Sequence, residues 1–252
     1  MVRRTEVLQG LRMMKFVSVL EIAANTYDPN SQVDNRMPRT VAPFRMARYP
    51  ITIAQFRSFL DECHREDGWH LPPGFPIDLP TGYPPPKARA RYGNHPVDSV
   101  NWFDALAFCH WLSARLKFEV RLPTEYEWQL AATGGDAAFT YPWGPDWDPA
   151  QEPWRANTLE SGLGRSTAVG MYPAGASLAG VFDLAGTVFE WCLNLFDEPD
   201  VTEFSASTDR RVLRGGSWYF RQHNARSASR FWFNPYFRPN YLGFRVVCSS
   251  PS

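Results

Sequence analysis

The sequence predicts an α+β domain that is rich in loops. Only three stretches show the apolar spacing of an amphipathic helix, and the candidate strands are short and scattered. The chain also contains 22 prolines and 17 glycines, which favour turns and irregular segments over long regular elements. No stretch repeats the strand–helix alternation that builds a parallel sheet.

Three helices are expected in the first half of the chain. The first runs from Thr52 to Glu66, where Thr52 is a suitable cap and apolar side chains recur on one face. The second spans Phe103 to Leu116 and carries an apolar stripe, with an acidic residue in its first turn. The third begins after Thr124, which forms the pattern of a capping box with Glu127, three residues later.

Long irregular segments separate these elements. Residues 69–96 are predicted to form a proline-rich insertion loop, and residues 133–180 are rich in Gly, Pro, Trp and Asn. Short strands are expected at Phe44–Tyr49, Val212–Arg214 and Gly243–Cys248. Because no internal repeat and no convincing linker divides the chain, residues 1–252 are predicted to form a single domain.

Charge and composition argue against several classes of protein. The formal net charge is zero, so no global field attracts nucleic acid or an anionic membrane. The apolar stretch Met13–Ile22 is interrupted by Lys15 and Glu21, and no run approaches the roughly 18 residues of a membrane span. We therefore expect no signal peptide and no transmembrane segment, and a location in the cytoplasm or on a phage or cell surface through another component.

The four cysteines form no CxxC pair, which argues against a metal knuckle or a redox motif. We expect buried thiols at Cys63, Cys109, Cys192 and Cys248. His110 lies on the apolar stripe of the second predicted helix, where a histidine at the core or its boundary is the expected role.

Six blocks of sequence follow one another along the chain, among them RLPTEYEW, YPWG, RGGSW and GFRVV. The six are His95–Ala105, Arg121–Trp128, Tyr141–Gly144, Phe182–Trp191, Arg214–Trp218 and Gly243–Val247. In content and order they resemble the motifs of the formylglycine-generating-enzyme (sulfatase-modifying-factor) family. The resemblance implies a C-type-lectin-like fold with little regular secondary structure, which agrees with the loop-rich pattern.

The resemblance does not extend to the thiols of the oxygen-dependent enzyme, which hold copper just after the motif that matches Arg214–Trp218. Their positions fall at Phe220 and Ala225, and neither side chain supplies a soft sulfur donor. The HxxxH-x-E arrangement of the related sulfoxide synthases is absent too, as are a phosphate-binding glycine loop and a GxSxG motif. We therefore expect a non-enzymatic protein that requires no cofactor.

Members of the family often bind structural calcium through oxygen ligands, and the resemblance makes Asn157 and Glu190 the candidate ligands here. Thr187 stands where an asparagine is usual, and a hydroxyl is a weaker calcium ligand than an amide carbonyl. The alternative is that Glu190 is a hydrogen-bonded structural carboxylate.

The stretch from Tyr219 to Leu242 has an unusual composition for a core. Eight of its residues are aromatic, with neither the period of a strand nor that of a helix, and aliphatic side chains are almost absent. Because Asp209 is the last acidic residue, the stretch is also locally basic. Rigid aromatics mixed with Arg, Asn, Ser and His are typical of binding surfaces. Some must still pack inward, because Phe231, Trp232 and Phe233 cannot all face one way.

Within residues 212–247, the letters at Gln222, Ala225–Ala228, Arg230, Pro235 and Arg238 match the constant letters of a variable region. The region that they resemble belongs to proteins diversified by retroelements, in which adenines of asparagine codons are randomised. The resemblance implies that the intervening positions vary and contact the ligand. These are Tyr219, Phe220, Arg221, His223, Asn224, Ser229, Phe231, Trp232, Phe233, Asn234, Tyr236, Phe237, Pro239, Asn240 and Tyr241.

Two details of this region bear on its interpretation. Trp232 is the one misfit, because its codon does not arise by replacing adenines in an asparagine codon. The constant Arg226 and Arg230, with Arg245 in the closing motif, are expected to hold the backbone as a scaffold through side-chain hydrogen bonds.

The leading hypothesis is a monomeric, non-enzymatic receptor that binds a protein or another macromolecule through this region. One alternative is an enzyme of the formylglycine-generating family with altered chemistry. A second is a single-strand nucleic-acid binder, because aromatics interleaved with arginine can stack on bases. Zero net charge and the lack of a known nucleic-acid-binding module argue against the second alternative.

Overall fold

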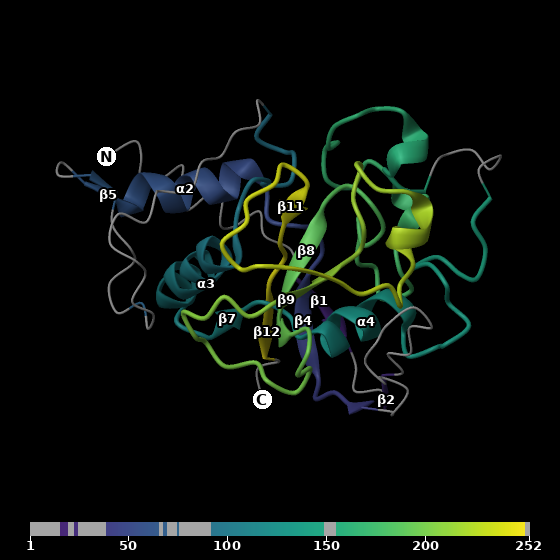
Figure 1. Cartoon of the computed structure of the whole chain (residues 1–252), viewed down its shortest axis with the longest axis horizontal. Helices are drawn as coiled ribbons and strands as arrows, with labels where there is room; N and C mark the ends of the chain where they lie inside the picture. Colours follow the sequence, from purple (N-terminus) through teal and green to yellow (C-terminus); the bar gives the residue numbers. More distant parts are fainter. Residues whose placement is uncertain are drawn as a thin grey trace.

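A computed structural model describes residues 16–19, 23–24, 39–65, 68–69, 75, 92–148 and 155–249. In these ranges two four-stranded sheets lie in the middle of the molecule, with helices on either side (Figure 1). The first sheet, in the order β1-β4-β12-β7, is made of Phe16–Val19, Phe44–Ala47, Val247–Ser249 and Val120–Arg121. The second, in the order β10-β9-β8-β11, is made of Phe231–Phe233, Arg211–Arg214, Phe189–Leu195 and Leu242–Gly243. Two short hairpins pair Ala23–Ala24 (β2) with Arg39–Thr40 (β3) and His64–Arg65 (β5) with Gly68–Trp69 (β6).

The three predicted helices are present as α2 (Ile53–Cys63), α3 (Trp102–Leu116) and α4 (Glu125–Thr133). The first ends earlier than predicted, because His64–Arg65 form the strand β5. The capping box expected at α4 is present: Glu127 N–H donates to Thr124 Oγ1 at 3.2 Å and Thr124 N–H donates to Glu127 Oε2 at 2.8 Å.

A second capping box begins α3, one residue earlier than predicted. Asp104 N–H donates to Asn101 Oδ1 at 2.9 Å, and Asn101 N–H donates to Asp104 Oδ2 at 3.0 Å. Both boxes place a carboxylate in the first turn of a helix, where the helix dipole favours negative charge.

The predicted strand Gly243–Cys248 is wrong as a single element. Leu242–Gly243 pairs in parallel with β8, whereas Val247–Ser249 pairs antiparallel with β4 and β7 in the other sheet. The chain crosses between the sheets at Phe244–Val246, where the side chain of Arg245 is fully buried. The predicted strands at Phe44–Tyr49 and Val212–Arg214 correspond to β4 and β9.

The loop predictions are tested only in part. Most of residues 69–96 lie outside the described residues. In the described part of residues 133–180 the chain is irregular beyond the end of α4, except for two 3-10 helices at Leu159–Ser161 (η1) and Pro173–Gly175 (η2). A third 3-10 helix, Gln222–Ala225 (η3), lies within the predicted variable region.

Two large apolar clusters form most of the core of the described residues, beside a small third one made of Ala156, Ala185 and Ala225. The larger joins α2 and α3 to β8, β11 and Phe244, and the smaller joins α4 to the β4, β8 and β9 strands. All four cysteines are buried, as expected, and none of them forms a disulfide. His110 is half-buried with its ring edge against Phe75, at a centroid distance of 5.9 Å, so it lies at the boundary of the core. Within the described residues, no helix is long and apolar enough to cross a membrane.

Candidate binding surface

The predicted variable region leaves β9 through a sharp turn that requires glycine. Gly215 and Gly216 have φ values of 93° and 71°, which side-chain-bearing residues rarely adopt. A Cβ at Gly216 would lie 2.9 Å from the backbone N and Cα of Ala225. The turn therefore packs the backbone of Gly216 directly against the end of η3.

Side-chain exposure separates the two sets of positions in this region. None of the fifteen predicted variable side chains is buried, and six of them are exposed: Tyr219, Arg221, His223, Trp232, Phe237 and Asn240. Among the eight constant positions between them, Ala225, Ser227, Arg230 and Pro235 are buried and the other four are half-buried. All exposed side chains therefore fall at variable positions and all buried ones at constant positions, whereas half-buried side chains occur in both sets.

Six of the variable aromatics form one connected cluster, which we call the aromatic cluster: Tyr219, Phe220, Phe231, Phe233, Phe237 and Tyr241. Tyr219 stacks on Tyr241 with ring centroids 5.3 Å apart. Phe220 and Phe231 both contact the buried ring of Phe189 in β8, at 5.3 and 5.4 Å. The cluster therefore rests on the core through its inner rings and exposes Tyr219 and Phe237.

Trp232 lies apart from the aromatic cluster. Side chains alternate along β10, so Phe231 and Phe233 face the cluster and Trp232 faces the other way. The centroid of its ring lies 4.4 Å from Cζ of the Arg210 guanidinium and 6.3 Å from the ring centroid of Phe196. The one residue that does not fit the predicted codon pattern is therefore also outside the cluster.

Two further variable side chains bond to the segment that precedes β9. Tyr236 packs on Phe103 of α3 with centroids 4.7 Å apart, and its hydroxyl donates to the carbonyl of Ala206 at 3.2 Å. Asn234 Nδ2 donates to the carbonyl of Thr208 at 3.5 Å. These positions lie at the edge of the region and combine exposure with contacts to the framework.

The constant arginines point inward, to carboxylates on other elements. Arg230 donates to Glu125, at the start of α4, through Nε at 2.6 Å and Nη2 at 2.8 Å. Arg245 donates to Glu190 of β8 in the same bidentate way, at 2.6 and 2.7 Å. It also donates to the carbonyls of Ala47 and Phe182. In both ion pairs each side chain is no more than 1% exposed.

Two more arginines complete this framework. Arg238 donates to Asp104, in the capping box of α3, at 2.9 and 2.8 Å. Arg226 Nε donates to the carbonyl of His223 at 2.9 Å, which closes the turn at η3. The sequence marks Arg238 as a constant position of the scaffold, but it does not reveal that Asp104, 134 residues away, is its partner.

The two candidate calcium ligands both bond to protein groups. Both oxygens of Glu190 accept from Arg245, and Oε2 also accepts from the indole N–H of Trp128 at 2.7 Å. Asn157 Oδ1 accepts from the hydroxyl of Ser161 at 2.9 Å, and its Nδ2 donates to the carbonyl of Arg165 at 2.9 Å. This arrangement matches the structural-carboxylate interpretation of Glu190.

The positions of the parent family's thiols contain no reactive group. Phe220 lies in the aromatic cluster and Ala225 is buried beneath Gly216. Burial raises the pKa of the Cys192 thiol well above its ordinary value and raises that of Cys109 and Cys248 as well. These thiols stay protonated at neutral pH and are therefore poor nucleophiles.

Sequence reasoning missed a neighbouring segment that extends the surface. The backbone N–H of Leu159 donates to the carbonyl of Phe220 at 2.9 Å, and the carboxylate of Glu160 accepts from the Gln222 N–H at 3.0 Å. Leu159 and Leu163 are each 47% exposed, so η1 and the following loop add apolar contact area beside the variable region. No local pattern marked them, because their role depends on a contact across about 60 residues.

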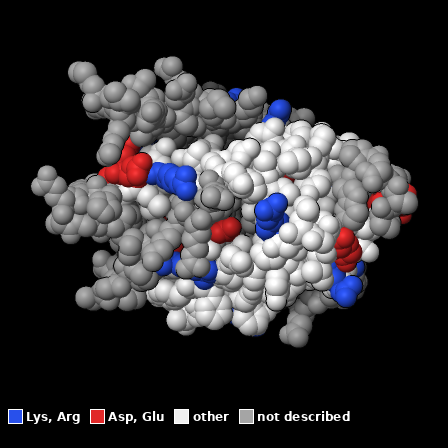
Figure 2. Space-filling model, turned by 90° about the horizontal axis from the view of Figure 1, so that it is seen from above, with Lys and Arg blue, Asp and Glu red and all other residues white. Residues whose placement is uncertain are grey.

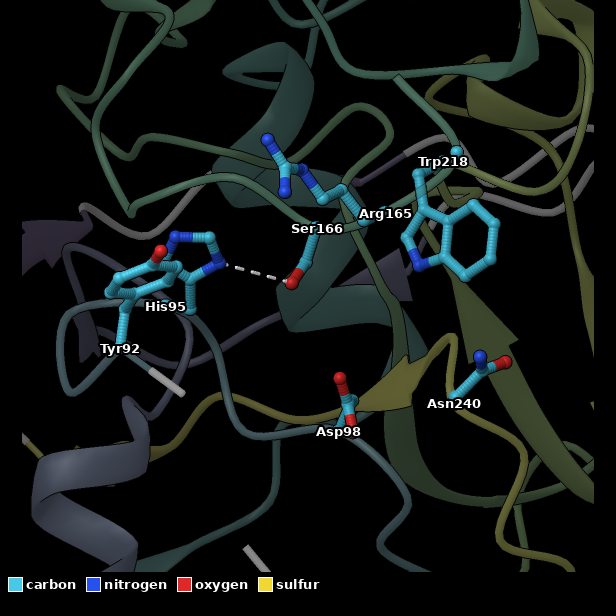
Figure 3. A pocket seen from close by; sticks show the side chains of 8 residues that line it. Tyr92, His95, Asp98, Arg165, Ser166, Trp218 and Asn240 are labelled. Atoms are coloured by element: carbon cyan, nitrogen blue, oxygen red, sulfur yellow. Dashed lines mark hydrogen bonds between the residues drawn. The ribbon is translucent and has the colours of Figure 1, made fainter. Parts of the chain in front are cut away.

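A pocket of about 310 Å³ opens next to the aromatic cluster (Figure 3). It is lined by Tyr92, His95, Asp98, Gly164, Arg165, Ser166, Trp218 and Asn240. His95 Nδ1 and Ser166 Oγ lie 3.3 Å apart, and burial together with the charge of Arg165 lowers the pKa of His95. The imidazole is therefore neutral at neutral pH, and Arg165 and Asp98 are the charged groups in the lining.

The surface at this end of the molecule carries few charges. In Figure 2 the described residues form a broad uncharged area in which only isolated Lys or Arg and Asp or Glu side chains appear. The exposed side chains of the variable region itself are mainly aromatic or uncharged polar, with Arg221 as the exposed arginine among them.

Comparison with known proteins gives the family. A model described as the sulfatase-modifying factor enzyme 1-like domain matches residues 12–250. The chain belongs to this family. Its curated relatives include hercynine oxygenase of Mycolicibacterium thermoresistibile, 33% identical over 92% of this chain and 56% of the relative. They also include the inactive C-alpha-formylglycine-generating enzyme 2 of Bos taurus, 34% identical over 60% of this chain and 50% of the relative. The chain thus spans about half the length of these curated relatives.

Solved structures of related proteins share the fold. Treponema denticola variable protein 1 superposes with a TM-score of 0.70 at 21% identity, covering 94% of this chain and 95% of that one. PvdO from Pseudomonas aeruginosa superposes with a TM-score of 0.68 at 23% identity, covering 93% of this chain and 94% of that one. The predicted α+β, C-type-lectin-like fold of the formylglycine-generating type is therefore confirmed.

Proposed function

We propose that this chain is a non-enzymatic receptor that binds a protein or another macromolecule through a diversified surface formed by residues 219–241. The observation that carries the proposal is the match between two independent divisions of the same segment. The resemblance divides it into variable and constant positions. In the structure all of its exposed side chains fall at variable positions and all of its buried side chains fall at constant positions. A surface selected to vary must keep its variable side chains out of the core, because the core tolerates few changes of volume.

The chemistry of the surface supports macromolecular recognition. Aromatic side chains such as Tyr219 and Phe237 bring contact area at low entropic cost, and Arg221 adds a flexible cation beside them. The ion pairs of Arg230 and Arg238 hold the backbone beneath, so the surface is presented in a fixed shape. Fixed presentation favours binding because less entropy is lost when the ligand docks.

The enzymatic alternative draws on relatives with enzymatic names, including the hercynine oxygenases. Against it, Phe220 and Ala225 replace the thiols of the copper-dependent reaction, and burial keeps Cys109, Cys192 and Cys248 protonated. We propose that the chain shares the family's framework without its thiol chemistry. Turnover of a cysteine-containing peptide, or oxygen consumption in its presence, would contradict this part of the proposal.

The DNA that flanks the gene tests diversification directly. We expect a reverse-transcriptase gene nearby and a near-copy of the DNA for residues 212–247 in which asparagine codons stand at the variable positions. Related chains should then differ from one another at those fifteen positions and agree at the eight between them. Related chains that are identical at all fifteen, with no such copy nearby, would refute the proposal.

A pair of displayed libraries tests whether the surface accepts diversity. The first randomises the six exposed variable positions, and the matched control randomises six constant positions, including Ala225, Arg230 and Arg238. We expect most clones of the first library to remain folded and resistant to protease, and most clones of the second to be degraded. Equal survival of the two libraries would mean that exposure does not separate the two sets.

A further inference from the structure

The pocket beside the aromatic cluster has a composition of its own, distinct from that of the variable surface. Of its eight lining residues, only Asn240 occupies a variable position. Tyr92, His95 and Asp98 lie in the segment that precedes α3, and Arg165 and Ser166 follow η1. Changes across the variable surface would therefore leave most of the chemistry of this pocket in place.

Hydrogen-bond donors dominate the lining. In the part of the chain that the structure describes, no acceptor lies within hydrogen-bonding distance of the Trp218 indole N–H or the Asn240 amide. The guanidinium of Arg165 likewise has no carboxylate within ion-pair distance among those residues. Figure 3 shows the indole nitrogen of Trp218 turned toward the pocket. A ligand that fits must therefore bring acceptor oxygens and preferably a negative charge.

The two charges of the lining lie on different sides of the pocket. Figure 3 places Asp98 across from Ser166 and Arg165, and Asp98 Oδ1 already accepts from the hydroxyl of Ser99 at 3.0 Å. An anionic group near Arg165 is thus separated from the carboxylate of Asp98.

We propose that this pocket is a binding site for a carboxylate group, held by the guanidinium of Arg165, with Ser166 and the indole of Trp218 as polar groups elsewhere in the lining. Arginine suits a carboxylate because its planar fork of donors matches the two oxygens. A volume of about 310 Å³ accommodates one small carboxylate compound or one acidic side chain. The neutral His95 accompanies Ser166 and adds no competing charge.

The two sources of such a carboxylate are a free small acid and an acidic side chain of a macromolecule. The second source would give every variant of the surface the same acidic anchor beside its variable contacts, because Trp218 touches Tyr219 at a ring distance of 5.5 Å. The proposed site does not depend on which of the two sources supplies the carboxylate.

Titration with small probes tests the site without any macromolecular ligand. N-acetyl-glutamate methylamide is added to the ¹⁵N-labelled chain, and the Trp218 indole signal, assigned from Trp218→Phe, is followed. We expect a saturable shift with this probe and none with the neutral N-acetyl-glutamine methylamide. Arg165→Gln should weaken binding at least about tenfold, equivalent to about 1.4 kcal/mol. The control Arg45→Gln, which removes an exposed arginine of β4, should leave it unchanged.

The outcomes divide as follows. Equal shifts with the glutamine probe or with sodium sulfate, or unchanged affinity in Arg165→Gln, would overturn the assignment. Tighter binding of succinate than of the blocked glutamate supports the site with a free acid as its ligand, and the reverse order supports an acidic side chain. Because no macromolecule is present, failure here leaves the proposed function standing, and failure of the library or DNA tests leaves this site standing.

Discussion

Replacing Arg230 with methionine should destabilise the chain far more than replacing exposed neighbours in the same segment. The substitution removes two charge-assisted hydrogen bonds to Glu125, at 2.6 and 2.8 Å, and one to the carbonyl of Phe196 at 3.2 Å. It leaves the carboxylate of Glu125, only 1% exposed, with Arg214 at 4.0 Å as its nearest cation. Breaking one side of a buried pair costs about 3–5 kcal/mol. For a chain of this size that lowers the Tm by roughly 6–20 °C.

Urea unfolding followed by tryptophan fluorescence and circular dichroism measures the loss. Phe237→Ser is the matched control from the same segment: its ring is 54% exposed, so we expect a loss of about 1 kcal/mol or less. The double variant Glu125→Met with Arg230→Met removes both charges and should return to within about 2 kcal/mol of the native chain, because apolar pairs replace buried ion pairs well. The reasoning is refuted if Arg230→Met costs no more than Phe237→Ser, or if the double variant is as unstable as the sum of its single variants.

Three further outcomes follow from the buried groups. Burial raises the pKa of Asp183 to about 6, above its ordinary 3.8, so the folded state binds more protons than the unfolded state between these values and stability falls as pH rises through that window. Asp183→Asn should therefore gain about 2–3 kcal/mol at pH 7 and nothing below pH 4, whereas a loss at pH 7 in urea melts would contradict this account. The buried cysteines, Cys192 among them, should react with a thiol reagent only after denaturation, and rapid labelling of the native chain would count against the raised pKa values. A chelator should leave the Tm unchanged, because Asn157 and Glu190 already bond to protein groups, and a fall that calcium restores would disprove it.

Local chemistry explains which elements could be predicted from the sequence. The capping box of Thr124 and Glu127 acts within three residues, so the start of α4 is visible without any tertiary information. The apolar stripes of α2 and α3 likewise repeat at the helical period. The family motifs supplied the fold itself, which these local signals leave open beyond α+β.

Long-range pairing explains what could not be predicted. β8 was not predicted, because it is buried on both faces and its sequence FEWCLNL lacks the alternation of a half-exposed strand. Glu190 and Asn194 also interrupt its apolar run, and the partner that makes Glu190 acceptable inside the sheet, Arg245, lies 55 residues away. The same partner explains the error at Gly243–Cys248, where the buried arginine marks the crossing between the two sheets.

The candidate site also has one part that the sequence predicts and another that depends on long-range contacts. The variable positions could be named because their pattern is contiguous in sequence, whereas the pocket brings together Tyr92, Arg165 and Trp218 from three distant segments. Neither periodicity nor a single motif reports such a contact. The exposed Leu159 and Leu163 were missed for the same reason.

The framework also determines which positions of the variable region tolerate substitution. Constant arginines anchor the segment to three different elements: Arg230 to α4, Arg238 to α3 and Arg245 to β8. Since these bonds involve no variable side chain, the backbone keeps its course whatever the exposed positions carry. The inner rings of the aromatic cluster are a different case, because Phe220 and Phe231 rest on the buried Phe189. A polar residue at either position removes apolar burial worth about 1–2 kcal/mol, whereas the same change at an exposed position costs little. We therefore expect the exposed variable positions to accept both polar and apolar side chains. The inner positions should accept mainly apolar side chains that differ in shape.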